Sequence, residues 1–336
     1  MKAIGYSKNG PITAENALED IDVPLPELRG HDVMVQVKGI SINPVDSKIR
    51  TNIGPAEGYK IIGFDGCGTI TALGAEVTDH KIGDDVFYSG DMTRPGSNSA
   101  YQAVDSRIIG KKPQSLDFEE AAAMPLTAIT AWELLFDSLR LQEGGEDGKT
   151  ILVLGGAGGV GSILIQLVKA LTNATIIATA SRKETHEWVK KMGADHVIDH
   201  TKPLKEQMDE LGFGADYVAS LRGTDQNWED IVAMMKPRGH IALIDDPQGI
   251  NINLGKQKAL SIHWEFMFTR PMFDMEDIAV QGQLLNRVSE MLDNGALQST
   301  MTKRLGALNA KSLIEAHKEQ ETGRVIGKNV MEGLGA

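Results

Sequence analysis

The chain has 336 residues, which suggests two domains, and its 41% hydrophobic and 24% charged residues are typical of a globular protein. The formal net charge of −12 argues against nucleic acid or an anionic membrane surface as a partner. The single cysteine, Cys67, excludes an intramolecular disulfide and a cysteine-based structural zinc site. The sequence shows no membrane-spanning run and no signal peptide, so we expect a cytoplasmic protein.

Short apolar runs at 34–37, 61–62, 66–73 and 85–88 are separated by Gly, Pro, Asp and Asn. This pattern predicts an antiparallel β-domain. After residue 116 the period becomes helical: Asp117 and Glu120 form a capping-box pattern, and Pro125 ends the short helix that they open. A second helix is expected over residues 127–139. We interpret Pro125 as the hinge between two domains.

Residues 150–161 predict a strand, a tight turn and the start of a helix. Gly156, Gly158 and Gly161 have the G-x-G-x-x-G spacing, in which the glycines permit the turn, the approach of a pyrophosphate and close helix–strand packing. The helix that follows the turn would direct its N–H groups and positive dipole end at the phosphates, and Gly159 and Val160 are expected to bind the cofactor together with the three glycines. The alternative is a tight turn that binds nothing.

Further strands are expected at 175–180, 197–199, 216–220 and 241–245, and residues 261–268 could form a sixth strand at the edge of the sheet. Helices are expected over 184–192, which Gly193 closes, and over 225–235. This alternation predicts a doubly wound parallel sheet, so the glycine turn is expected to bind a dinucleotide. A long helix over 276–294 and a last strand at 325–330 are expected to return to the first domain.

The chain resembles the medium-chain dehydrogenase/reductase superfamily over its whole length. The segments 39–50 (GISINPVDSKIR) and 124–128 (MPLTA) are similar to the quinone-oxidoreductase branch, and the segments 193–200 (GADHVIDH) and 263–270 (HWEFMFTR) resemble zinc-type alcohol dehydrogenase-like proteins. The resemblance implies a GroES-like antiparallel β-domain at 1–124, completed by 271–336, and an NADP-binding Rossmann domain at 125–270. It also implies a homodimer.

The chain departs from the alcohol dehydrogenases at the zinc ligands. Those enzymes have a cysteine at the position of Asn43, a His-Glu pair at Phe64 and Asp65, and a four-cysteine lobe in the region that corresponds to residues 88–101. A catalytic zinc needs three Cys, His or acidic ligands, so we predict that the chain binds no metal. His196 and His200 could be read as a ligand pair, but the resemblance places His200 near the adenosine of the cofactor.

The segment after the second strand of the parallel sheet discriminates between NAD and NADP. NAD-binding proteins have an acidic residue there, which binds the ribose 2′-hydroxyl, whereas this chain has Ser181, Arg182 and Lys183. A hydroxyl and two cations suit a 2′-phosphate, so these residues and His200 predict NADP(H) as the cofactor. The alternative is an ordinary basic turn.

For the nicotinamide end, the resemblance implies that Asn43 and Thr127 hold the ring amide or its ribose from opposite domains. It assigns Lys48 a proton-donor role less directly, because related quinone reductases have a tyrosine there; the alternative is a solvated charge on a short helix. The predicted activity is zinc-independent reduction of a quinone or an α,β-unsaturated carbonyl compound by NADPH. A zinc alcohol dehydrogenase and an NADPH-binding protein without turnover are the alternatives.

Overall fold

The computed structural model describes residues 1–335, and the chain forms two compact units. The first unit consists of Met1–Ile129 together with Phe268–Ala336, and the second is Thr130–Met267. Residues 125–129 therefore belong to the first unit, whereas the sequence assigned them to the dinucleotide domain. Within the described residues, no helix is long and apolar enough to cross a membrane.

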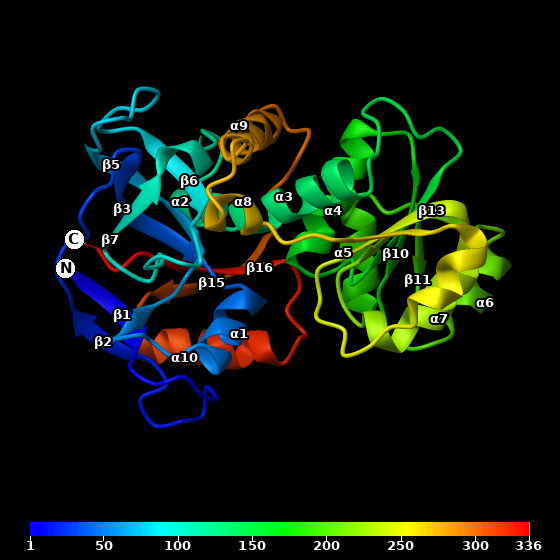
Figure 1. Ribbon diagram of the computed structural model, residues 1–336, viewed down its shortest axis with the longest axis horizontal. Coiled ribbons are helices and arrows are strands. Elements are labelled where there is room, and N and C mark those ends of the chain that lie inside the picture. The colour runs from blue at the N-terminus through cyan, green and yellow to red at the C-terminus, as the bar shows by residue number, and fades with distance from the viewer. Residues whose placement is uncertain (336) are drawn as a thin grey trace. The chain divides into compact units, whose positions relative to one another are not determined.

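The first unit contains two sheets, coloured mainly blue and cyan in Figure 1. A small antiparallel sheet has the order β2-β1-β4, and the larger one has the order β15-β16-β3-β5-β6-β8, with β7 also paired to β3. Among the described strands of this unit, β15 and β16 form the one parallel pair. The strands are β1 (Lys2–Tyr6), β2 (Glu19–Asp22), β3 (Asp32–Ser41), β4 (Lys60–Ile61), β5 (Asp65–Leu73), β6 (Asp85–Ser89), β7 (Tyr101–Asp105), β8 (Ile109–Lys111), β15 (Met301–Ala307) and β16 (Lys328–Glu332).

The chain returns to the first unit at its C-terminal end, as predicted. Strand β16 pairs with β3 in antiparallel register, with Val330 opposite Ser41. Most residues of β3 are buried, and Val33 and Val35 of β3 pack with Ile70 of β5 in the core of the larger sheet. The helices of this unit are α1 (Pro44–Asn52), η1 (Ser106–Ile108), α2 (Phe118–Ala122), α8 (Thr269–Met272), α9 (Val280–Asp293) and α10 (Ala310–Glu321), and α1 packs against α10 (Figure 1).

The helical segment around Pro125 begins as the sequence predicts, but its second helix ends differently from the prediction. Asp117 caps α2 by accepting from the N–H of Glu120 at 2.9 Å, and α2 ends before Pro125. Helix α3 (Pro125–Trp132) then continues as a π-helical turn, η2 (Glu133–Ser138), where the sequence predicts regular α-helix. The N–H of Leu139 bonds to the carbonyl of Leu134 at 2.9 Å, one residue further back than in an α-helix.

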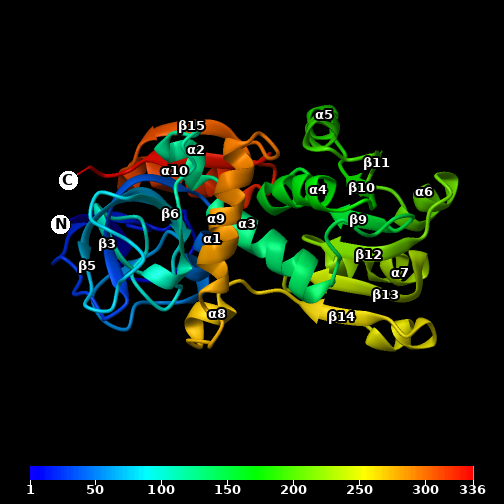
Figure 2. The same ribbon diagram turned by 90° about the horizontal axis from the view of Figure 1, so that it is seen from above.

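The second unit contains a wholly parallel sheet, as the sequence predicts, and its six strands have the order β11-β10-β9-β12-β13-β14. Helices α4 and α5 pack together on one face, and α6 and α7 on the other (Figure 2). The elements are β9 (Thr150–Leu154), α4 (Gly159–Leu171), β10 (Thr175–Thr179), α5 (Lys183–Met192), β11 (His196–Ile198), α6 (Leu204–Glu210), β12 (Ala215–Ser220), α7 (Thr224–Met234), β13 (Met235–Leu243), η3 (Ile252–Lys258) and β14 (Ser261–Trp264).

Strand β14 is the predicted edge strand, although it ends four residues earlier than expected. The strand order reverses between β9 and β12, because β10 and β11 lie on one side of β9 and β12 to β14 on the other. Ligands of open parallel sheets bind at such a switch point, beyond the carboxyl ends of the strands. The glycine turn follows β9 at this edge.

Candidate functional site

The turn after β9 has the geometry of a dinucleotide-binding loop. Gly155 has φ of +79°, so the left-handed residue of the turn precedes the predicted glycine triplet. Helix α4 begins at Gly159 with Gly158 as its N-cap, and its first internal bond runs from the N–H of Ser162 to the carbonyl of Gly158 at 2.9 Å. The N–H groups of the first turn, including those of Gly159 and Val160, therefore have no acceptor within the helix.

The three glycines of the motif have different surroundings. A Cβ on Gly161 would lie 2.6 Å from the carbonyl oxygen of Gly155, and a Cβ on Gly156 would lie 3.0 Å from the Cβ of Ala178. A Cβ on Gly158 would meet only the Gly155 carbonyl, at 3.5 Å. Gly161 and Gly156 thus serve packing, and the space above Gly158 is open, so the loop fits the phosphates of a dinucleotide.

The predicted 2′-phosphate residues follow β10 and β11. Ser181 and His200 are exposed, and Arg182 precedes α5 and lies 3.2 Å from Glu184. Lys183 behaves differently: its side chain is 89% exposed and lies 3.8 Å from Glu187 on the surface of α5. The structure therefore places Ser181, Arg182 and His200 at the carboxyl edge of the sheet and gives Lys183 an ion pair along its own helix.

Arg222 is a cation at this edge that the sequence reading missed. It follows β12, and its Cβ lies 3.5 Å from the position that a Cβ on Gly155 would take. Burial lowers the pKa of His200, and Arg222 and Arg182 lower it further, while Asp199 opposes them. Arg182 and Arg222, which follow two other strand ends, therefore both lie within electrostatic range of His200. No local sequence signal indicates this, since β9 and β12 become neighbours only in the folded sheet.

In the first unit, the predicted residue Asn43 belongs to a buried polar cluster centred on Asp65. The Asp65 Oδ2 accepts from Ser41 Oγ at 2.5 Å, from Asn43 Nδ2 at 2.7 Å and from Lys328 Nζ at 3.0 Å. The Asp65 Oδ1 accepts from the backbone N–H of Leu126 at 2.8 Å. Both carboxylate oxygens are thus engaged, and a single carboxylate joins β3, α1, α3 and β16.

Lys328 supplies the positive charge of this cluster. Its ammonium also donates to the carbonyl of Ile42 at 2.9 Å and to Asn43 Oδ1. The side chains of Lys328 and Asp65 are only 4% and 0% exposed, so the pair is shielded from water. The sequence reading missed Lys328 because 263 residues separate it from Asp65.

Asn43 and Thr127 are both buried in the first unit, which differs from the prediction that they belong to opposite domains. The Thr127 hydroxyl donates to the carbonyl of Met124 at 3.1 Å, so its lone pairs are available to accept. The Asn43 amide is held at both ends, by Asp65 and Lys328. Lys48 is exposed on α1, next to the buried face of that helix.

Helix α1, which carries Lys48 and begins after Asn43, is fixed by polar contacts on its buried face. Burial raises the pKa of Asp46 to about 7, and its carboxylate accepts from the N–H of Asn43 at 2.7 Å. Ser47 Oγ lies 3.3 Å from Nδ1 of His317 on α10, and burial lowers the pKa of His317 to about 3, so the ring is neutral. Arg50, 1% exposed, pairs with Glu321.

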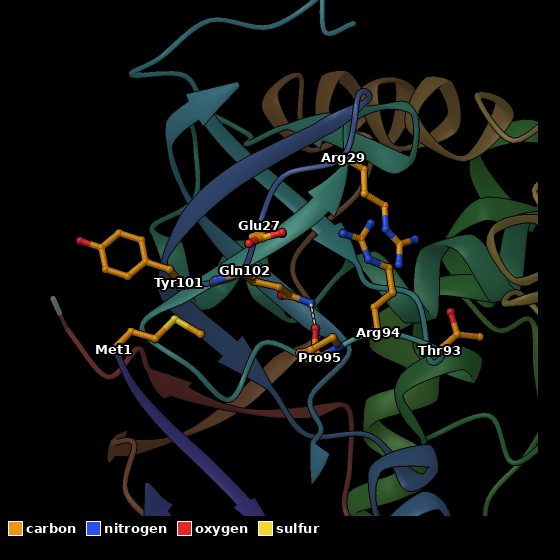
Figure 3. Close-up of a pocket in the computed structure, with 11 residues that line it drawn as sticks. Met1, Glu27, Arg29, Thr93, Arg94, Pro95, Tyr101 and Gln102 are labelled. Carbon is orange, nitrogen blue, oxygen red and sulfur yellow. Dashed lines mark hydrogen bonds between the residues drawn. The ribbon is translucent and has the colours of Figure 1, made fainter. Parts of the chain in front are cut away.

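A cavity of about 170 Å³ lies in the first unit, between the start of the chain and β7. Figure 3 shows Arg29 and Arg94 at its wall, and Gln102 donating to the carbonyl of Pro95. Arg94 forms two bonds to Asp32, at 2.6 and 2.8 Å, so its charge is neutralised within the protein. We assign no ligand to this cavity.

Two family models match the chain. The alcohol dehydrogenase GroES-like domain matches residues 29–116, and the zinc-binding dehydrogenase model matches residues 159–287. Despite the second name, residues 1–335 contain no group of three His, Cys, Asp or Glu side chains that could hold a metal ion.

Relatives extend over the whole chain. It is 39% identical to the zinc-type alcohol dehydrogenase-like protein of Staphylococcus epidermidis, over 98% of this chain and 99% of the relative. It is 30% identical to the 2-methylene-furan-3-one reductase of Solanum lycopersicum, over 99% of this chain and 79% of the relative. The crystal structure of a protein described as a zinc-dependent alcohol dehydrogenase from Rhizobium etli is 49% identical, with a TM-score of 0.97 over 100% of this chain and 99% of that one.

Proposed function

We propose, starting from the fact that the chain belongs to the medium-chain dehydrogenase/reductase superfamily, that it is a zinc-independent, NADPH-dependent reductase of quinones or α,β-unsaturated carbonyl compounds. The observation that carries this proposal is the cluster around Asp65. The similarity of the chain to a 2-methylene-furan-3-one reductase supports reduction of conjugated carbonyl compounds. The homodimer and the cytoplasmic location stay predictions.

The donor set of the cluster does not fit a zinc ion. Of the residues at the three ligand positions, Phe64 offers no donor atom, Asn43 has its amide oxygen bonded to an ammonium, and Asp65 has both oxygens engaged. Zinc binding would require removal of the Lys328 ammonium, which lies 3.0 Å from Asp65. The chemistry of these three positions therefore argues against the zinc-dependent alcohol oxidation that the names of two relatives suggest.

The glycine turn and the basic residues beside it fit NADPH. The open space above Gly158 and the free N–H groups of α4 suit the pyrophosphate, and Ser181 and Arg182 suit the 2′-phosphate. When bound, the cofactor supplies the hydride. In a conjugated acceptor the new negative charge is delocalised onto an oxygen, so a few hydrogen-bond donors suffice without a Lewis acid.

The residues of the first unit orient the reacting groups and supply the proton. The Thr127 hydroxyl donates to Met124 and presents lone pairs to the NH₂ group of a carboxamide. Asn43, held by Asp65 and Lys328, has one N–H left to donate, and it cannot rotate without breaking two bonds. Such positioning supplies most of the rate, and Lys48 or water provides the proton.

The test follows NADPH absorbance with a simple quinone, an enone, an aldehyde and ethanol, each with and without a chelator. We expect quinone or enone turnover that the chelator does not change, no reaction with ethanol, and less than stoichiometric zinc by elemental analysis. Thr127→Val should slow turnover strongly, whereas Lys48→Ala, the matched change of an exposed residue, should slow it much less. Chelator-sensitive alcohol oxidation would refute the proposal, and NADPH binding without turnover of any acceptor would indicate a binding protein.

A further inference from the structure

The carboxyl ends of four strands bring together residues that lie far apart in the sequence. The N–H of Leu221 bonds to the carbonyl of Leu154 at 3.3 Å, so the contact between β9 and β12 continues up to the residue before the glycine turn. Arg222 is therefore the first residue beyond the ladder, directly beside Gly155. On the other side of β9, the N–H of Gly155 donates to Thr179 Oγ1 at 3.0 Å, close to where β10 ends.

Arg222 follows the end of β12, and His200 follows the end of β11. Arg222 is one of the two arginines whose charge lowers the pKa of His200, and Arg182 is the other. The ends of β10 and β9 lie between those of β11 and β12. The space beyond these ends is where a parallel sheet binds the adenosine half of a dinucleotide.

We propose that Arg222 binds the adenosine 2′-phosphate of NADPH together with Arg182, in the role that the sequence assigned to Lys183. This inference rests on the proposed NADPH site and adds a specificity-determining residue to it. Lys183 is 89% exposed, and its ammonium lies 3.8 Å from Glu187 on its own helix, α5. A guanidinium can form two parallel hydrogen bonds to a phosphate, which an ammonium cannot.

A second arginine adds positive charge to an edge that also carries acidic side chains. Arg182 lies 3.2 Å from Glu184, and Asp199, on which the charge of Lys202 acts, lies beside His200. Arg222 adds a guanidinium to these charges and so makes the edge more favourable for a phosphate dianion. The phosphate can displace Glu184 from Arg182, because the Glu184 side chain is 57% exposed and can turn into water.

The test measures binding of 2′,5′-ADP and 5′-AMP by calorimetry, because these two fragments differ only in the 2′-phosphate and need no turnover. Arg222→Gln should weaken 2′,5′-ADP binding about ten- to hundredfold and change 5′-AMP binding less than about twofold. Lys183→Gln removes the same charge two residues from Ser181 and is the matched control, with less than about a twofold effect on either fragment. NMR titration of His200 in Arg222→Gln should show a raised pKa, since one of the two cations that lower it is gone.

Each outcome has a separate meaning. A wild-type preference for 2′,5′-ADP that Arg222→Gln retains would overturn the role of Arg222 and leave the NADPH proposal intact. An equal loss of both fragments would also overturn it, because Arg222 would then contact the shared adenosine. A wild type without any preference for 2′,5′-ADP, and an Arg182→Gln variant without effect, would overturn the choice of NADPH itself.

Discussion

Removal of the Lys328 ammonium should destabilise the first unit, because it leaves the charge of Asp65 buried. Breaking a buried ion pair from one side costs about 3–5 kcal/mol. Asp65 would retain its bonds from Ser41, Asn43 and the N–H of Leu126, so we expect Lys328→Met to cost about 3 kcal/mol, at the lower end of that range. Since folded domains have about 5–15 kcal/mol of stability, the variant should still fold.

The positions of the tryptophans allow the two units to be followed separately. All four, Trp132, Trp188, Trp228 and Trp264, lie in the second unit. In urea, tryptophan fluorescence therefore reports the second unit, and hydrogen exchange of β3 and β5 amides reports the first. With a urea m-value of about 1–3 kcal/mol/M, a loss of about 3 kcal/mol in Lys328→Met should lower the midpoint for the first unit by about 1–3 M.

A charge-neutral double variant provides the control. Lys328→Met combined with Asp65→Asn removes both charges, so its loss of stability should be clearly smaller than the sum of the two single losses. Additive losses, or a first-unit midpoint within about 0.3 M of wild type in Lys328→Met, would refute the assignment of the pair as a coupled buried charge.

Three further predictions concern other residues. Burial raises the pKa of Asp46 to about 7, so the contribution of this carboxyl group to stability is full below its unfolded pKa of about 4 and is lost as the pH rises through 7. Asp46→Asn should therefore match wild type in urea unfolding at pH 4 and be more stable than wild type at pH 8. Equal stability of the two proteins at both pH values would refute this prediction. Gly161→Ala should lower the melting temperature, because the new Cβ would lie 2.6 Å from the carbonyl oxygen of Gly155. In Gly158→Ala the Cβ would lie 3.5 Å from the same oxygen, so this variant should keep the wild-type melting temperature and weaken NADPH binding in a calorimetric titration. The reverse pattern would contradict the assigned roles. Arg182→Ala should weaken NADPH binding about ten- to hundredfold and leave NADH binding nearly unchanged, and a similar loss for both cofactors would count against a phosphate contact.

The parallel sheet could be predicted from the sequence because its signals are local. The β-branched runs that form β9 and β10, and the glycines after β9, each identify a strand or a turn within a few residues. The same holds for the cap at Asp117 and for the end of α2 before Pro125. Side-chain periodicity did not reveal the π-helical turn at Glu133–Ser138, because this turn differs from an α-helix in its backbone hydrogen bonds.

The site was only partly predictable, since its contacts depend on strand order and on long-range pairing. Lys183 and Arg182 are adjacent in the sequence and were both assigned to the 2′-phosphate. In the structure, Lys183 lies 3.8 Å from Glu187, an i, i+4 spacing that the sequence analysis did not use. Arg222 comes beside Gly155 only through the order β9-β12. The partner of Asp65 could not be inferred, because Lys328 has no motif around it and lies in a strand from the far end of the chain.

The division of the first unit into two chain segments has a consequence for protein synthesis. A growing chain releases Asp65 from the ribosome 263 residues before Lys328, whereas the second unit, Thr130–Met267, is contiguous and is complete while β16 has yet to be made. Until β16 arrives, Asp65 has no ammonium to pair with, and burial of its charge is unfavourable. Domains usually mature from the N-terminus during translation. In this chain the later unit can fold first, and the earlier one reaches its final packing only when its last strand joins β3.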